Sequence, residues 1–218
     1  ARCSLLQKLV DDYELVSQHR GYVLYNGLFK GMSFTFGSLG IGGPSWVIGL
    51  HELNLAGTKT FLRVGTSGIL SSRVSPGDLV IPTEILSDEF LSNYICTDKL
   101  LTTEKSLLKI IEDSLDKVKT KCHFGPIHSK DFLYMEESYH YPTSKTLEAR
   151  MKQVKLMGAL VTEMDCATLF AFGLAKKSAT AAVLAAINED PTISLTAQRN
   201  ALYLALYSIL RYSGESND

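Results

Sequence analysis

The sequence lacks long hydrophobic runs: no window approaches the ~18 consecutive apolar residues that a membrane-spanning helix needs. It also lacks an excess of either charge, because 22 Lys and Arg residues face 23 Asp and Glu residues, for a formal net charge of −1. Proteins that bind nucleic acid usually carry a basic stripe or a strongly positive balance. We therefore expect neither a membrane nor a nucleic-acid partner.

The four cysteines also lack a spacing pattern that indicates disulfide pairs or a metal site. Cys3, Cys96, Cys122 and Cys166 show neither a CxxC motif nor the spacing of a zinc site, and the five histidines show no metal-ligand pattern. Free thiols in a reducing compartment are the simplest interpretation, so we expect a cytoplasmic protein without a metal site. Repeats, low-complexity tracts and linker-like segments are also absent, and residues 1–218 are interpreted as one domain.

Segments with the pattern of strands and helices alternate along the chain. Strands are predicted at Gly21–Leu28, Gly31–Phe36, Lys59–Val64, Asp78–Ile81, Cys122–Ile127, Ala159–Thr162 and Ala179–Ile187. Helices are predicted at Ser45–Leu55, Thr102–Thr120, Thr143–Leu156, Asp165–Ala175 and Thr196–Arg211. This alternation predicts an α/β fold, a three-layer sandwich in which helices flank a central mixed β-sheet.

Two glycine-rich stretches lie close together, GSLGIGGPS (Gly37–Ser45) and FLRVGTSG (Phe61–Gly68). Glycine turns let a backbone approach a ligand and point N–H groups at an anion, although two tight turns in a packed domain have the same pattern. The second stretch contains Arg63, in an apolar strand directly before the expected turn. A buried guanidinium needs an anion, and phosphate matches it in a bidentate way. A structural salt bridge is the alternative, and Thr66 offers a hydroxyl to the same anion.

Two acidic stretches complete the candidate site. Glu163, Met164 and Asp165 stand at a strand-to-helix turn, where carboxylates can accept hydrogen bonds from the vicinal hydroxyls of a ribose. Alternatively, Asp165 caps the following helix. Glu189 and Asp190, in the sequence NEDP, are either a general acid or part of a surface turn. Because ligands bind beyond the carboxyl ends of strands in such sheets, these residues together fit a site for a pentose and a phosphate.

The motifs GIGGPS, FLRVGTSG, PGDLVIP and EMDCATL, in this order, resemble the nucleoside phosphorylase-I family, most closely its uridine phosphorylase branch. The similarity runs from near residue 1 to about Asn188 and is densest between Gly37 and Pro82. It implies an α/β sandwich assembled as homodimers or rings of dimers, with inorganic phosphate as co-substrate and no cofactor. The implied reaction is reversible phosphorolysis, in which phosphate attacks the anomeric carbon of a nucleoside and yields ribose 1-phosphate and free base.

The same resemblance implies roles for individual residues. The family's phosphate ligands match Arg2, Arg20, Arg63 and Thr66, with Arg20 reaching the site of a neighbouring subunit. Its ribose ligands match Glu163, Met164 and Asp165. Contacts with the base are assigned to Thr66, Ser67, Gly68, Leu133, Glu136 and Glu137. The implied catalytic residues are Arg63 and Asp165, with Glu189 or Asp190 as a candidate acid.

Three departures from the family concern the framework. The resemblance begins after the family's first strand and its glycine-containing phosphate loop, so the domain is expected to lack both. Asp165 stands where members of the family have Glu. The loss of one methylene withdraws the carboxylate by about 1.5 Å, which lowers activity or favours deoxyribose. Gly21 replaces the carboxylate that holds potassium in some members, so no such ion is expected.

The base-reading positions also depart from the family. The loop Tyr134–His140 lacks the Gln and Arg with which uridine phosphorylases read uracil. The acidic pair of NEDP is compatible with the aspartate of purine-specific relatives. We therefore expect phosphorolysis of uridine or a related pyrimidine nucleoside. The alternatives are a purine nucleoside phosphorylase, or a catalytically weak relative that binds ligand or supports a partner subunit.

Overall fold

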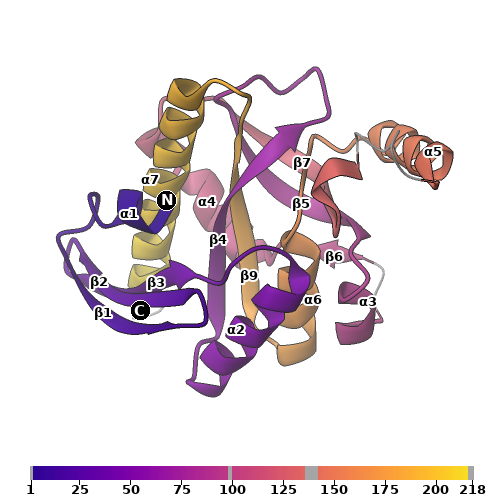
Figure 1. Cartoon of the computed structure of the whole chain (residues 1–218). Helices are drawn as coiled ribbons and strands as arrows, with labels where there is room; N and C mark the ends of the chain where they lie inside the picture. The colour runs from indigo at the N-terminus through magenta and orange to yellow at the C-terminus, as the bar shows by residue number, and fades with distance from the viewer. Residues whose placement is uncertain (1, 98–99, 136–141, 216–218) are drawn as a thin grey trace.

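A six-stranded mixed sheet runs through the centre of the computed structural model, which describes residues 2–97, 100–135 and 142–215 (Figure 1). Its spatial order is β6 (Leu101–Thr102), β5 (Leu79–Asp88), β7 (Cys122–Lys130), β8 (Val161–Glu163), β4 (Thr60–Ile69) and β9 (Ala179–Ala186). The first residues of β5 also pair with the end of β9, with Leu79 opposite Ala185. The strands from β5 to β9 therefore form a closed ring, to which β6 is added.

Helices cover both faces of this sheet. One face carries α2 (Gly43–Leu55), α3 (Ser92–Ile95) and α6 (Cys166–Lys176), and the other carries α4 (Lys105–Asp113) and α7 (Pro191–Glu215) (Figure 1). The expected three-layer α/β sandwich with a mixed central sheet is confirmed. The remaining long helix, α5 (Ser144–Leu156), projects from the side of the molecule. None of the helices in the described part of the chain has both the length and the apolar character needed to cross a bilayer.

Two apolar clusters fill the spaces between the three layers. In β4, Phe61 belongs to the cluster with α2 and α6, whereas Leu62 and Val64 face the cluster with α4 and α7. Successive side chains of a strand point to opposite faces of the sheet, so Arg63 lies on the same face as Phe61. The strand period thus places a charged side chain in the layer beneath α2 and α6.

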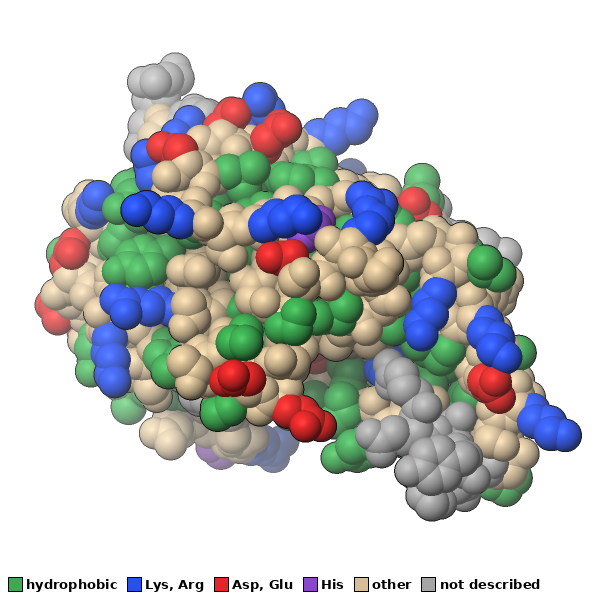
Figure 2. Space-filling view, turned by 90° about the horizontal axis from the view of Figure 1, so that it is seen from above, with side chains coloured by type: hydrophobic (Ala, Val, Ile, Leu, Met, Phe, Trp, Pro, Cys, Tyr) green, Lys and Arg blue, Asp and Glu red, His purple; other side chains and the backbone are tan. Residues whose placement is uncertain are grey.

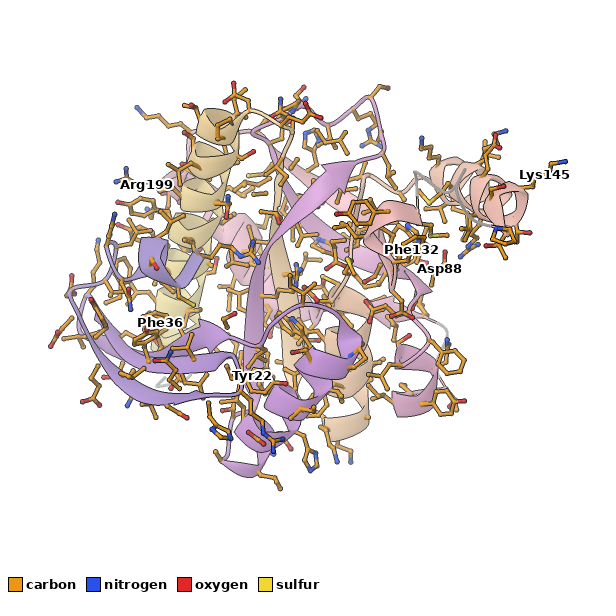
Figure 3. All side chains as sticks on the ribbon, viewed as in Figure 1. Tyr22, Phe36, Asp88, Phe132, Lys145 and Arg199 are labelled. Atoms are coloured by element: carbon orange, nitrogen blue, oxygen red, sulfur yellow. The ribbon has the colours of Figure 1, made fainter. Side chains whose placement is uncertain are left out.

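A separate three-stranded antiparallel sheet precedes α2 and consists of β1 (Asp12–His19), β2 (Tyr22–Phe29) and β3 (Met32–Ser38). It follows the short helix α1 (Arg2–Leu6). The β2–β3 hairpin confirms the prediction of two strands there. The sheet packs on α7 through the rings of Phe29 and Tyr207, whose centroids are 5.4 Å apart. At its other end, the Tyr22 hydroxyl donates to the Ser45 carbonyl oxygen in α2, at 2.9 Å (Figure 3).

Some predicted boundaries are wrong. The helix expected over Thr102–Thr120 is limited to α4 and a 3-10 turn at Leu115–Lys117, because Glu104 caps α4 by accepting a hydrogen bond from the Leu107 N–H. The final helix begins at Pro191, earlier than expected. Other predicted strands extend beyond their expected ends, since pairing partners rather than local sequence set their length.

The glycine-rich stretches have different structures. Gly40 and Gly42 have φ angles of +80° and +84°, so the first stretch is a turn that leads into α2, as predicted. The second stretch was expected to turn after Val64, but β4 continues to Ile69. Its residues remain extended because β9 pairs with β4 as far as Ser67, and β8 pairs with the last two residues.

The surface carries both signs of charge. On the face shown in Figure 2, Lys and Arg side chains are interspersed with Asp and Glu rather than gathered in one patch. This distribution agrees with the formal net charge of −1.

Candidate active site

Arg63 lies at the centre of a buried cluster of charged side chains. It is only 5% exposed, and its Nη2 donates to Asp165 Oδ2 at 2.6 Å and lies 3.0 Å from Glu163 Oε2. Burial alone would lower the pKa of the guanidinium, but the nearby acidic groups, Glu163 first, raise it above its ordinary value. Arg63 is therefore a fixed positive charge. The salt bridge that the sequence offered as an alternative is present, and Arg63 also keeps N–H groups that can bind an anion.

Those remaining N–H groups are the distinctive property of Arg63. Its Nε and Nη1 are buried and have no hydrogen-bond partner among the described residues. A buried donor without a partner costs about 1–3 kcal/mol, so such groups usually serve an ordered water, an ion or a ligand. Each of these N–H groups can donate to an anion that reaches its own edge of the guanidinium.

Gly65 makes room for the guanidinium. A Cβ atom at Gly65 would lie 1.8 Å from Nη1 and 2.5 Å from Cζ of Arg63. The two residues share one face of β4, so the arginine side chain lies along its own strand. The Trp46 ring packs nearby, with its centroid 5.4 Å from Cζ. The glycine in RVGTSG thus provides space for a side chain, whereas we had expected it to form a turn.

Arg2 and Thr66 add a second cation and a hydroxyl to this cluster. Nη1 of Arg2, in α1, donates to Oγ1 of Thr66 at 3.4 Å. Burial and, next, the positive charge of Arg63 lower the pKa of Arg2, so the two guanidinium groups are close enough to repel each other. An anion between them relieves that repulsion. The structure thus brings together three of the four predicted phosphate ligands.

Glu163, rather than Asp165, caps α6. The Glu163 carboxylate accepts hydrogen bonds from the backbone N–H groups of Asp165, at 2.9 Å, and Cys166, at 3.1 Å. Asp165 occupies the N-cap position, but its side chain makes no capping bond. Instead, Asp165 Oδ1 accepts from the Gly42 N–H at 2.6 Å, and Oδ2 accepts from Arg63. This carboxylate therefore joins the two glycine-rich stretches. Met164, between the two acids, is half-buried.

Glu89 and Ser129 lie behind Glu163, and the sequence reasoning missed both. Glu89 is fully buried and accepts hydrogen bonds from the Ala167 N–H at 3.1 Å, the Thr168 N–H at 2.9 Å and the Thr168 hydroxyl at 2.5 Å. Burial first, and then the charge of Glu163, raise the pKa of Glu89 to about 8. The sequence shows only an acidic pair, Asp88 and Glu89, seven residues after the end of the predicted strand Asp78–Ile81.

A neighbouring network ties α5 to the sheet. Asp88 accepts from Arg150 Nε at 2.9 Å and lies 2.8 Å from His128 Nε2, and His128 Nδ1 lies 3.1 Å from Thr162 Oγ1. Burial would raise the pKa of Asp88, but the hydrogen bonds from His128 and Arg150 outweigh it and lower the pKa to about 2. Figure 3 shows Asp88 beside Phe132, where β5 and β7 end. The network fixes the edge of the sheet at which β5 and β7 end.

The remaining polar candidates lie on the surface. Arg20 is exposed in the turn between β1 and β2, with a φ of +50°. Glu189 is exposed as well, and Asp190 Oδ1 accepts from the backbone N–H groups of Thr192, at 2.8 Å, and Ile193, at 3.3 Å. Asp190 therefore caps the start of α7, which favours the surface-turn alternative for NEDP. Its role as an acid stays a prediction.

The residues predicted to contact the base differ in their exposure to solvent. Ser67 is buried and its hydroxyl donates to the Ala185 carbonyl oxygen at 3.3 Å, whereas Gly68 and Leu133 are exposed. Glu136 and Glu137 lie outside the described residues. Among the residues that the structure describes, no group of three or more His, Cys, Asp or Glu is arranged to hold a metal ion.

Comparison with known proteins identifies relatives along nearly the whole chain. The family model described as "Phosphorylase superfamily" matches residues 2–203. Guanosine phosphorylase of Halorubrum lacusprofundi is 32% identical over 176 residues, which cover 80% of this chain and 69% of that protein. Uridine phosphorylase of Treponema pallidum is 31% identical over 177 residues, with the same two coverages. The crystal structure of uridine phosphorylase from Vibrio fischeri superposes with a TM-score of 0.84 at 27% identity, over 96% of this chain and 88% of that one.

Proposed function

Because the chain belongs to the phosphorylase superfamily and is a nucleoside phosphorylase, we propose that Arg63, Arg2 and Thr66 hold the phosphate that attacks its nucleoside. The observation that carries this assignment is the pair of buried, unpartnered N–H groups on Arg63, next to a second arginine. Phosphate and nucleoside are the substrates, and the product is ribose 1-phosphate with the free base. We propose that no cofactor takes part.

The proposed mechanism depends on fixed charges. Arg2 and Arg63 bind the phosphate dianion below the sugar, and one of its oxygens forms a bond to the anomeric carbon. The bond between that carbon and the base nitrogen breaks, and its electron pair leaves with the base. Positive charge develops on the ribose meanwhile, and the adjacent phosphate stabilises it.

Glu163 and Asp165 have two tasks in this proposal. They hold Arg63 in place, and their remaining lone pairs accept hydrogen bonds from the ribose hydroxyls. Met164 contacts the sugar between them. Thr66, Ser67, Gly68 and Leu133 border the base.

Uridine or a related pyrimidine nucleoside is the proposed substrate, supported by the uridine phosphorylases among the relatives and solved structures. A specific observation favours a second candidate, guanosine, because the guanosine phosphorylase of Halorubrum lacusprofundi is 32% identical to this chain. Glu189 or Asp190 is then the proposed acid for the purine ring.

Arg20 has a different place in the proposal. Its exposed position in a tight turn suits contact with another molecule better than contact with its own site. We propose that the protein forms a homodimer, or a ring of dimers, in which Arg20 completes the phosphate site of the neighbouring subunit. A cytoplasmic location is also proposed, supported by four free thiols, of Cys3, Cys96, Cys122 and Cys166.

Base release from uridine, thymidine, inosine and guanosine, with and without phosphate, tests the proposed function. We expect phosphate-dependent release of uracil. Phosphate-dependent release of guanine alone would select the second candidate, and cleavage without phosphate would overturn the phosphate assignment. Thymidine, which lacks the 2′-hydroxyl and carries a 5-methyl group on the base, reports on tolerance of both changes together. If no base is released, stabilisation by uridine with phosphate in a thermal-shift assay would identify a binding protein without turnover.

A further inference from the structure

Ser129 lies between two carboxyl groups. Its Oγ is within hydrogen-bond distance of Glu89 Oε1, lies 2.5 Å from Glu163 Oε1, and accepts a hydrogen bond from the Ala167 N–H at 3.1 Å. A hydroxyl group has one hydrogen, so Ser129 donates to only one of the two carboxyl groups. The other short contact is a hydrogen bond only if that carboxyl group carries a proton of its own.

The surroundings of the two acids identify the protonated one. Glu163 lies 3.0 Å from the guanidinium of Arg63 and accepts two backbone hydrogen bonds, all of which favour its charged form. Glu89 accepts hydrogen bonds from Ala167 and Thr168 that also favour its charged form, but it is fully buried, and no ion pair to it is found within the described residues. Burial and the charge of Glu163 raise the pKa of Glu89 to about 8, in agreement with a proton on this residue at neutral pH.

We propose that Glu89 is a positioning residue, a neutral carboxylic acid that donates to Ser129, which in turn donates to Glu163 and holds that carboxylate against Arg63. This inference rests on the proposed function, in which Glu163 supports Arg63 and accepts from the ribose. The direction of each hydrogen bond is fixed along the whole series from Glu89 to Arg63. Glu89 itself touches no substrate.

The proton on Glu89 also sets the charge of the phosphate site. Arg2 and Arg63 supply two positive charges, and Glu163 and Asp165 supply two negative ones. With Glu89 neutral, this cluster is balanced before the phosphate dianion arrives. An ionised Glu89 adds a third negative charge in a medium of low dielectric constant, and both Glu163 and phosphate are then repelled.

Several charged or titratable groups lie near Glu89. The charged or titratable neighbours, from β8, α6, β4, β5 and the segment after β7, are Glu163, Asp165, Cys166, Arg63, Asp88 and Asp131. Burial raises the pKa of the Cys166 thiol well above its ordinary value, so it stays neutral. Asp88 forms an ion pair with Arg150, whose Nη2 lies 2.8 Å from Oδ1. Of these groups, Glu89 is the one whose pKa is raised to about 8.

The pH dependence of phosphorolysis tests the inference. We expect kcat/KM of the natural protein to decline above about pH 8, and Glu89→Gln to lose this decline, because its amide donates to Ser129 at every pH. Glu112→Gln, at an exposed carboxylate of α4, is the matched control and should keep the natural profile. Phosphate and nucleoside titrate identically in all three proteins, so a difference in profile belongs to the protein.

Two further measurements keep the inference falsifiable if Glu89→Gln folds poorly. The infrared spectrum of the natural protein at pH 6 should contain the carbonyl band of a buried protonated carboxyl group, and this band should fade as the pH rises through about 8. Ser129→Ala removes the hydroxyl that links Glu89 to Glu163. We expect KM for the nucleoside to rise about tenfold in this variant, the equivalent of one lost hydrogen bond.

The outcomes separate this inference from the proposed function. If the band is absent at pH 6, or if Glu89→Gln retains the alkaline decline, Glu89 is ionised and the inference is overturned. If the natural protein cleaves no nucleoside with phosphate, the proposed function fails, whereas the infrared band still tests the proton on Glu89.

Discussion

The guanidinium of Arg63 lies directly against Gly65. A Cβ atom added at Gly65 would be only 1.8 Å from Nη1 of Arg63. On its other side, Arg63 forms ion pairs with Glu163 and Asp165, so the guanidinium cannot move away from Gly65 without breaking them. The glycine is thus part of the anion site without contacting the anion. It sets where the positive charge lies.

Gly65→Ala should destabilise the protein by about 1–3 kcal/mol, because the new methyl group overpacks a buried site. It should also raise KM for phosphate, since the guanidinium must leave its position. Urea unfolding and phosphate-dependent kinetics measure the two effects. Gly68→Ala is the matched control for stability, because its Cβ would meet Thr162 Cγ2 at an ordinary 3.4 Å. Equal stability of the two variants would contradict the packing argument.

Asp165→Asn should lower the free energy of unfolding by about 1–3 kcal/mol. The amide can serve either the Gly42 N–H or Arg63 as an acceptor, but not both, while Arg63 keeps its contact with Glu163. Asp113→Asn removes one carboxylate from an exposed ion pair with Lys109 and should cost about 0–1 kcal/mol. A smaller loss in Asp165→Asn than in this control would show that Asp165 does not hold the two stretches together.

Arg2→Ala should raise KM for phosphate at least tenfold with a smaller change in KM for the nucleoside. Arg2 is half-buried, so its removal leaves no unpaired buried acid, whereas Arg63→Ala would strand Glu163 and Asp165. Arg73→Ala, at an exposed arginine, is the control and should match the natural protein. An unchanged KM for phosphate in Arg2→Ala would remove this residue from the phosphate site.

Arg20→Ala should be inactive alone. At a phosphate concentration well below the KM of Arg2→Ala, a mixture of the two variants under conditions that exchange subunits should be more active than the two variants assayed separately. In a mixed dimer, one site receives an intact Arg2 from one chain and an intact Arg20 from the other. Mass spectrometry of the intact assemblies verifies the exchange. Exchange without recovered activity would place Arg20 outside the neighbouring site.

Glu89 also predicts how stability depends on pH. Its folded-state pKa of about 8 lies above the ordinary value of 4.5, so the folded protein binds this proton more tightly than the unfolded chain does. The contribution of Glu89 to stability is complete below about pH 4.5 and is lost as the pH rises to about 8. Relative to the natural protein, Glu89→Gln should therefore become more stable across this window, by up to a few kcal/mol. Parallel stability curves would show that Glu89 does not titrate there.

The sequence placed Arg63, Glu163 and Asp165 at strand ends on one edge of the sheet and offered a salt bridge as the alternative to a bound anion at Arg63, but it did not name the acidic partners. An arginine in an apolar strand requires an anion, and acids at the end of another strand are brought to the same edge of a sheet. Arg63, Glu163 and Asp165 meet for these reasons. The periodicity of α2, α5 and α6 also predicted helices close to their observed bounds, because each has enough turns to show a repeated pattern.

Other features depend on tertiary contacts that a sequence pattern does not contain. β1 is exposed along its whole length, so it has no buried face to produce alternation. Gly65 lies in a glycine-rich stretch that is typical of a turn. Only the guanidinium of Arg63 beside it explains why this position of the strand is a glycine. Glu89 resembles a surface acid, yet it is fully buried because the N-terminus of α6 supplies its hydrogen-bond donors.

The closed ring of strands has a consequence for how the protein is made. Ser67 and Ala185, hydrogen-bonded neighbours on β4 and β9, are 118 residues apart, and Arg63 and Asp165 are 102 residues apart. During translation β4 leaves the ribosome well before the two strands that flank it, and Arg63 has no counter-charge until Glu163 and Asp165 have been synthesised. Contacts across such separations form slowly, because a long loop must be closed first. The nascent chain therefore presents β4 as an unpaired strand with a lone arginine until β8 and β9 pair with it.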